Sequence, residues 1–183
     1  MNARPLSFKP TQHGVAAVEF ALVATILLVL LLGIIEFGRL FFTINSVQEI
    51  TRRAAREQVV RWTSAQDAVQ RMAVLRPGSS GTVNFPGAGD ITNADVRLSF
   101  HNTYPEAVAG TDPITGIASP GENISNCLNE QDNCIRFVRA TLSQDANGLT
   151  PLDFNVIAPY MPADTFSLPF STVIMPAEAL GLL

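Results

Sequence analysis

Few side chains in this sequence could carry covalent or acid–base chemistry. Its only cysteines are Cys127 and Cys134, and its only histidines are His13 and His101. The cysteines lack the Cys-x-x-Cys spacing of redox catalysis, and the histidines offer no metal-ligand spacing to them. The chain also contains no G-x-S-x-G, H-E-x-x-H or phosphate-binding loop. We therefore expect no catalytic residues, no metal site and no cofactor.

The two cysteines bound a polar, hairpin-like segment, CLNEQDNC. Its spacing allows either a structural disulfide or two free thiols, and we favour the disulfide. Closing so short a loop would stabilise the fold by ~2.5 kcal/mol in the loop-entropy model. Such a bridge persists only in an oxidising compartment, which here would be the periplasm. His101 alternates with apolar residues, which predicts a surface histidine on the polar face of a strand.

Glu19 is the only charged residue in the apolar stretch of residues 15–35. A carboxylate inside the hydrocarbon of a membrane costs ~2.5–3.5 kcal/mol. If the chain were cut between Gly14 and Val15, the new α-amine would lie four residues before Glu19, on the same helix face. That amine, in the same or a neighbouring subunit, could neutralise Glu19. Alternatively, Glu19 reaches the lipid headgroups from its place near the start of the stretch. Both interpretations stay open on the residues alone.

The element that would position Glu19 is a long helix. At 1.5 Å per residue, residues 15–35 span ~31 Å, close to the hydrocarbon thickness of a bilayer. No small-residue cleavage site follows, so we expect the segment to be retained. No proline occurs between Pro10 and Pro77, and no glycine between Gly38 and Gly78. This predicts one continuous helix over residues 15–75, apolar all round at first and amphipathic afterwards.

Beyond this helix, short apolar runs between proline- and glycine-rich segments predict an antiparallel sheet. Strands are expected at residues 96–101, 135–143 and 171–175, with a weaker one at 82–85. The second strand changes its apolar phase between Phe137 and Val138, which indicates a bulge or burial on both faces. The fold class is thus α+β. The domain organisation is a leader peptide (1–14), a transmembrane helix (15–38), an amphipathic helical stalk (39–76) and a periplasmic α+β domain (77–183).

Charge is distributed unevenly along the chain. The whole sequence is 47% hydrophobic and 15% charged, with a net charge of −4, which argues against a nucleic-acid binder that depends on phosphate contacts. Residues 1–76 hold nine Lys and Arg against five Asp and Glu, whereas residues 77–183 hold three against eleven. The basic stalk and acidic domain either are ordinary solvated surfaces or complement each other between neighbouring subunits.

The N-terminal motifs resemble those of a known family. Gly14-Val-Ala-Ala-Val-Glu19-Phe, followed by an apolar run ending Gly33-Ile-Ile-Glu36-Phe-Gly38-Arg39, is similar to the signature of TadE-like proteins. These are pilin-like proteins of the tight-adherence (Flp-type) pilus machinery. The resemblance is dense over about residues 12–57, with weaker echoes in IRFVRATLS and STVIMPAE near the C-terminus. Residues 77–130 resemble nothing in the family.

This resemblance implies a processing site and a location. Family members are cut by a prepilin peptidase after the glycine before the helix, which here is Gly14 and leaves Val15 as the N-terminus. Glu19 then matches the pilin glutamate. The mature protein would stay in the bacterial inner membrane as a single-pass minor pilin (pseudopilin) or assembly factor. Its expected partners are the inner membrane, the prepilin peptidase and other pilin-like subunits, with no nucleic acid and no small-molecule substrate. Entry into an extracellular pilus stays open.

The family implies a cytoplasmic N-terminus and a periplasmic C-terminal domain, whereas basic residues alone predict the reverse. Arg4 and Lys9 precede the apolar helix, but Arg39, Arg52, Arg53 and Arg56 follow it. We follow the family because nearby glutamates can pair with these arginines and because the cysteines favour an oxidising compartment. The alternative function is a membrane-tethered periplasmic binding module whose helix is only an anchor. An enzyme is not expected.

Overall fold

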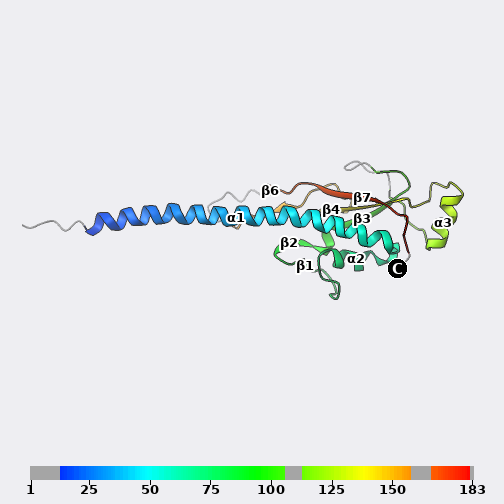
Figure 1. The fold of residues 1–183 in the computed structure, drawn as a ribbon, viewed down its shortest axis with the longest axis horizontal. Helices are drawn as coiled ribbons and strands as arrows, with labels where there is room; N and C mark the ends of the chain where they lie inside the picture. Colours follow the sequence, from blue (N-terminus) through cyan, green and yellow to red (C-terminus); the bar gives the residue numbers. More distant parts are fainter. Residues whose placement is uncertain (1–12, 106–112, 158–165, 182–183) are drawn as a thin grey trace, which may run out of the picture.

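The computed structural model describes residues 13–105, 113–157 and 166–181. A single long helix, α1 (His13–Val60), is the longest element of the structure. Its first half projects from the rest of the protein, and its second half is surrounded by a small head (Figure 1). The long apolar helix followed by small antiparallel sheets confirms the predicted α+β layout.

The main sheet has three antiparallel strands in the order β3 (Val96–His101), β4 (Phe137–Leu142) and β7 (Ser171–Pro176). All three predicted strands in these regions are therefore present. The central strand β4 pairs with both neighbours without a register shift. Five of its six residues are buried, so its change of apolar phase reflects burial on both faces and not a bulge.

The remaining elements are short. They are η1 (Thr63–Ala65), α2 (Gln66–Ala73), β1 (Asn84–Phe85), β2 (Ala88–Thr92), η2 (Asn93–Asp95), α3 (Pro120–Leu128), β5 (Asp153–Phe154) and β6 (Phe166–Ser167). β1 pairs with β2, and β5 pairs with β6, in two further antiparallel pairs. β1 falls within the weak strand predicted at residues 82–85.

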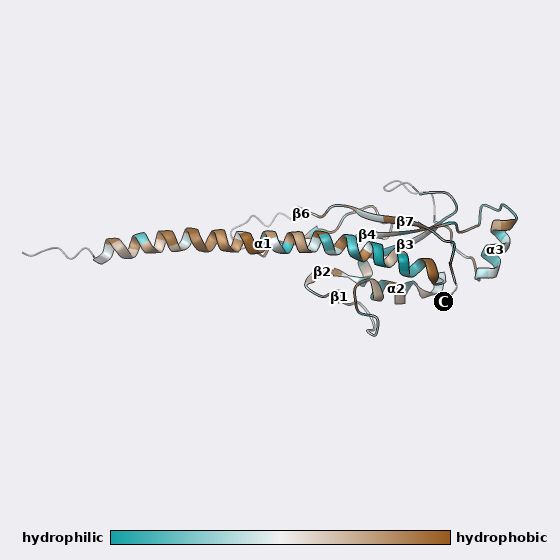
Figure 2. Ribbon diagram, viewed as in Figure 1, coloured by the Kyte–Doolittle hydropathy of each residue, from teal (hydrophilic) through white to brown (hydrophobic). Residues whose placement is uncertain are grey.

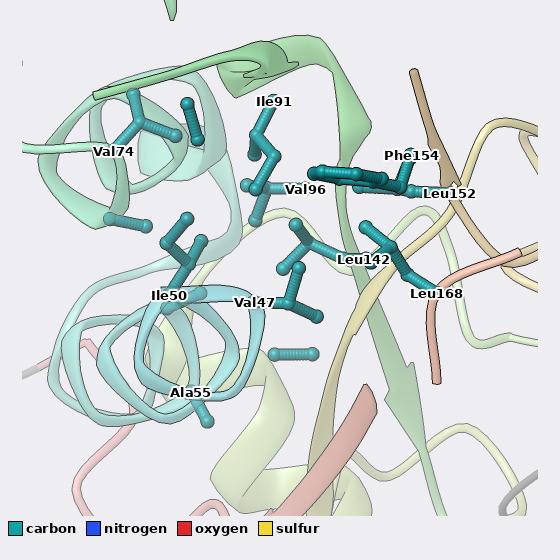
Figure 3. Packing of buried hydrophobic residues seen from close by; sticks show 14 residues of the cluster. Val47, Ile50, Ala55, Val74, Ile91, Val96, Leu142, Leu152, Phe154 and Leu168 are labelled. Atoms are coloured by element: carbon teal, nitrogen blue, oxygen red, sulfur yellow. The ribbon is translucent and has the colours of Figure 1, made fainter. Parts of the chain in front are cut away.

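The core forms where the second half of α1 meets the sheet on one side and α2 with β2 on the other (Figure 3). Val47, Ile50 and Ala54 recur at steps of three and four residues, which places them on one helix face. Ala54 and Ala55 are fully buried, and their small side chains let the helix approach its neighbours closely. A buried hydrogen bond of 2.6 Å between the hydroxyls of Thr51 and Ser171 ties α1 to β7.

The prediction of one continuous helix over residues 15–75 was wrong, because α1 ends at Val60 and α2 packs against it as a separate helix. The Gln58 side-chain amide donates hydrogen bonds to the carbonyl oxygens of Arg61 (3.1 Å) and Trp62 (3.2 Å), which satisfies carbonyls beyond the helix end. The backbone of Trp62 is extended, and its indole packs against a second core cluster that contains Phe100 and Ile135. The packing of this large, partly buried side chain on the head outweighs the local preference for helix.

The expectation of a surface position for His101 was also wrong, since this residue is only 2% exposed. Its Nε2 lies 2.9 Å from the Ser99 hydroxyl. The chain near Ile114 runs along the edge of β3, with its amide donating to the Phe100 carbonyl at 2.8 Å, so residues distant in sequence pack close to His101. Burial, followed by the positive charge of Arg139, lowers the pKa of His101 below its ordinary value of 6.5.

The segment CLNEQDNC is not a hairpin. Cys127 lies in the last turn of α3, and Cys134 precedes β4. Ser119 caps the start of α3, where its hydroxyl accepts a hydrogen bond from the Glu122 amide at 3.2 Å, and Pro120 occupies the first turn. This is a standard helix start, with a capping hydroxyl, a proline and an acidic residue in sequence.

Candidate functional site

The projecting half of α1 carries the candidate site. Residues 14–35 are exposed apart from the half-buried Ala24 and Gly33. The exposed residues include large apolar side chains, of which Phe20 is 76% exposed. Figure 2 shows this half as almost uniformly hydrophobic. By length and composition it could cross a membrane, and none of its most apolar window is buried against the head. An apolar helix that packs on none of the other described residues fits a membrane anchor.

The structure brings Gly14, Val15 and Glu19 together at the free end of this helix. Val15 and Glu19 are one turn apart, and all three residues are exposed. Among the described residues, none forms an ion pair with Glu19. A Cβ atom added at Gly14 would meet no atom of the described residues within 4 Å, so this part of the structure leaves the backbone there open to an approaching protein. Glu19 is thus a carboxylate on an apolar rod, without a partner charge inside the described part of its own chain.

A second feature, which the sequence did not reveal, marks the point where the head begins to cover α1. Glu36 is 9% exposed, and its Oε1 accepts hydrogen bonds from the Arg39 guanidinium (2.9 Å) and from the Ile157 amide (3.2 Å). Arg39 also donates to the Asn155 carbonyl and lies 4.3 Å above the centre of the Phe154 ring. We call these five residues the Glu36–Arg39 clasp. It fastens the segment before β6 to the helix where the helix emerges from the head.

The exposed face of the packed half of α1 is basic. Asn45, Gln48, Arg52 and Arg56 follow one another at helical spacing on this face, and all are exposed. Arg53 is paired instead with Glu49 at 3.6 Å, as predicted. Among the described residues, neither Arg52 nor Arg56 forms an ion pair. Like charges one turn apart repel each other, so this basic ridge gains from an acidic surface placed against it.

The two cysteines lie in the head, away from Gly14, Val15 and Glu19. Cys127 and Cys134 form a disulfide with a Cα–Cα distance of 4.9 Å, which is the pairing favoured from the sequence. The bond joins the end of α3 to the residues before β4. Beside it, the Asn123 carboxamide oxygen accepts a hydrogen bond of 2.8 Å from the Ile135 amide. Within the described ranges, no cluster of three His, Cys, Asp or Glu residues could hold a metal ion.

Comparison with known families shows what this helix is similar to. Residues 14–56 match the family model described as TadE-like protein. The chain is TadE-like over this segment. The match starts at Gly14 and covers the projecting half of α1, which carries Glu19. It also includes the clasp residues Glu36 and Arg39, and it ends at Arg56 in the basic ridge.

A TadE-like domain implies a protein associated with the Tad pilus, and its family is non-enzymatic in general. The family match covers none of the strands of the head. No curated protein and no solved structure matches the chain at a significant level.

Proposed function

We propose that this TadE-like protein is a minor pilin-like subunit (pseudopilin) or assembly factor of a Tad-type pilus, cut by a prepilin peptidase after Gly14. The observation that carries the proposal is the projecting TadE-like helix with a lone carboxylate near its free end. A simple anchor has no use for this costly charge. A helix that must recognise other helices inside the membrane does have a use for it.

After cleavage, Val15 would carry a positive α-amine at the start of the helix. Glu19 would then lie within the first turns of the mature helix, where an acidic side chain interacts favourably with the helix dipole. Pairing with the amine of Val15, in the same subunit or a neighbour, would neutralise both charges in the apolar surroundings. Only correctly aligned neighbours satisfy such a pair, so it would set the register between helices.

The proposed orientation places the N-terminus in the cytoplasm and the head in the periplasm. The disulfide between Cys127 and Cys134 supports this assignment because such a bond persists in an oxidising compartment. Of the four arginines just after the apolar helix, Arg39 pairs with Glu36 and Arg53 pairs with Glu49, whereas Arg52 and Arg56 form no ion pair among the described residues. These pairs reduce the positive charge that would otherwise favour retention of this side in the cytoplasm.

Contacts between heads and stalks would complete the assembly. The basic ridge at Arg52 and Arg56 faces outward, and residues 77–183 carry eleven acidic against three basic side chains. The acidic head of one subunit therefore complements the exposed stalk of another in charge. This contact would supplement packing between the apolar helices, which would bury the exposed apolar side chains of residues 15–35.

Processing is tested by the intact mass of protein purified from membranes of cells with an active peptidase. We expect the loss of residues 1–14 and a mature chain that begins at Val15. Gly14→Leu should keep the leader, because close approach of a protease to the scissile bond favours glycine. The structure offers Gly38→Leu as a matched control, since an added Cβ meets nothing within 4 Å at either glycine. Recovery of the full-length chain from wild-type cells would contradict the proposed cleavage.

The second candidate function is a membrane-tethered binding module. It is favoured by a cavity of about 430 Å³ in the head, whose described lining includes Gln66, His101 and Arg139. This volume falls in the range of small-molecule sites. A tethered module would work with any apolar anchor, whereas the pilin-like role needs Glu19. Substitution of Glu19 therefore separates the two functions.

A further inference from the structure

The length of the projecting helix fixes the height of the head above a membrane. From Val15 to Glu36 an α-helix rises about 31 Å, which is the thickness of the hydrocarbon layer. When Val15 lies at one edge of this layer, Glu36 lies at the other. The head begins to cover α1 at this same residue, through the Glu36–Arg39 clasp. The end of the head nearest the projecting half of α1 is therefore level with the lipid headgroups and the first acyl carbons.

An apolar groove opens at this level, between α1 and the β5–β6 pair. It has a volume of about 160 Å³, and its described lining consists of Glu36, Phe37, Leu40, Phe154, Val156 and Phe166. Glu36 is the one polar residue in this described lining, and its carboxylate already accepts hydrogen bonds from Arg39 and Ile157. The groove consequently offers almost only aromatic and aliphatic surface to an occupant.

Exposed apolar side chains surround this groove. Phe37 is 59% exposed, Phe166 is 54% exposed, and Ile157 is 71% exposed. Phe37 continues the apolar surface of the projecting helix without interruption, since Ile34 and Ile35 beside it are also exposed. Phe166 and Ile157 come from a different part of the chain and extend the same surface onto the head. An apolar patch contiguous with a membrane helix marks a site of membrane contact.

We propose that this end of the head rests in the membrane interface and that the groove takes a phospholipid acyl chain. Phe37, Phe166 and Ile157 lie among the first acyl carbons, and the groove walls replace neighbouring lipid on one side of that chain. Aromatic side chains are favoured at this depth of a bilayer. The contact holds the head at a fixed height and tilt before assembly. It rests on the membrane span of α1 and not on the pilus role.

The contact is tested by fluorescence quenching with brominated lipids. Trp62 is the only tryptophan, so Trp62→Phe gives a dark background in the full chain. Single tryptophans are then introduced by Phe166→Trp and, independently, by Ile157→Trp. Ile26→Trp, near the middle of the span, is the positive control. Leu128→Trp is the negative control, because this residue is 79% exposed on α3 at the far end of the head (Figure 1). All variants are placed in vesicles of phosphatidylethanolamine and phosphatidylglycerol.

Lipids brominated near the headgroup should quench the Phe166→Trp and Ile157→Trp variants strongly, and their emission should shift to the blue on insertion. Lipids brominated deep in the chain should quench Ile26→Trp most. Leu128→Trp should respond to neither. If Ile26→Trp is quenched while both groove variants behave like Leu128→Trp, the membrane contact is overturned but the span stands. If Ile26→Trp is not quenched either, the span itself fails.

A second copy of the protein is the competing occupant, and the same variants detect it. Burial against another subunit would shift the emission of Phe166→Trp as the ratio of protein to lipid rises, without quenching by bromine. That result would overturn the proposal. Quenching that is independent of this ratio is the outcome expected for an acyl chain in the groove.

Discussion

Removal of the Arg39 guanidinium should loosen the head on its helix. In Arg39→Met the stem is kept, but Glu36 loses its charged partner, the Asn155 carbonyl loses a donor, and the Phe154 ring loses the cation above it. A hydrogen bond with one charged partner, such as each of those that Arg39 donates, contributes ~1.5–3 kcal/mol, and an exposed cation–π contact contributes ~0.5–1 kcal/mol. Because the Arg39 side chain is 26% exposed, solvent screening reduces the sum to ~2–3 kcal/mol.

The loss is measured by urea unfolding of the full chain in detergent micelles, followed by the fluorescence of Trp62. This indole packs in the head and reports its unfolding. Arg53→Met is the matched control, because its pair with Glu49 is 3.6 Å long and more exposed, and we expect a change of under ~0.5 kcal/mol there. In Glu36→Gln/Arg39→Met the loss should be smaller than the sum of the single losses. If Arg39→Met is as stable as Arg53→Met, the clasp does not hold the head to the helix.

Two further predictions concern the head. Alkylation of the membrane protein without reduction should label neither Cys127 nor Cys134, and labelling of both would contradict the disulfide. Cys134→Ser should lower the free energy of unfolding by ~2.5 kcal/mol, because it removes the bridge. The pKa of His101 in the folded protein lies below its ordinary value of 6.5, so the unfolded chain binds this proton more tightly. The contribution of neutral His101 to the free energy of unfolding should therefore be fully present above pH 6.5 and should be lost as the pH falls towards the lowered pKa. His101→Gln should flatten this decline in a pH series of unfolding midpoints, and an unchanged slope would show that other groups cause it.

The elements with strong local patterns could be predicted from the sequence. The apolar run, followed by a stretch without proline or glycine after Gly38, located α1; alternation located β3, and a short run stopped by Pro176 located β7. The end of α1 at Val60 was missed because it depends on where the Trp62 side chain is buried, and no local signal records that. The burial of His101 likewise depends on a segment that lies beside β3 only in the folded head. α3 was missed although Ser119, Pro120 and Glu122 form a readable helix start.

Part of the candidate site could likewise be predicted from the sequence, and part depends on contacts between distant residues. Gly14, Val15 and Glu19 are neighbours in sequence, so one motif was enough to find them. The Glu36–Arg39 clasp joins residues up to 121 positions apart. Two opposite charges three residues apart at the end of an apolar run indicated an ion pair, but not that the head would bury it. The groove between α1 and the β5–β6 pair is a product of the same long-range contact.

The most direct test of the pilin-like role is the number of pili on cells that carry Glu19→Ala. Removal of the carboxylate makes insertion of the helix easier, so membrane levels and cleavage should stay near those of the wild type. An unpaired amine at Val15 in a buried helix contact would cost ~3–5 kcal/mol, enough to abolish a weak lateral assembly step. Thr25→Ala is the control, because this exposed hydroxyl already donates to the Ala21 carbonyl of its own helix at 2.7 Å. We predict pili with Thr25→Ala and none with Glu19→Ala; wild-type piliation with Glu19→Ala would contradict the assembly role and favour a simple anchor.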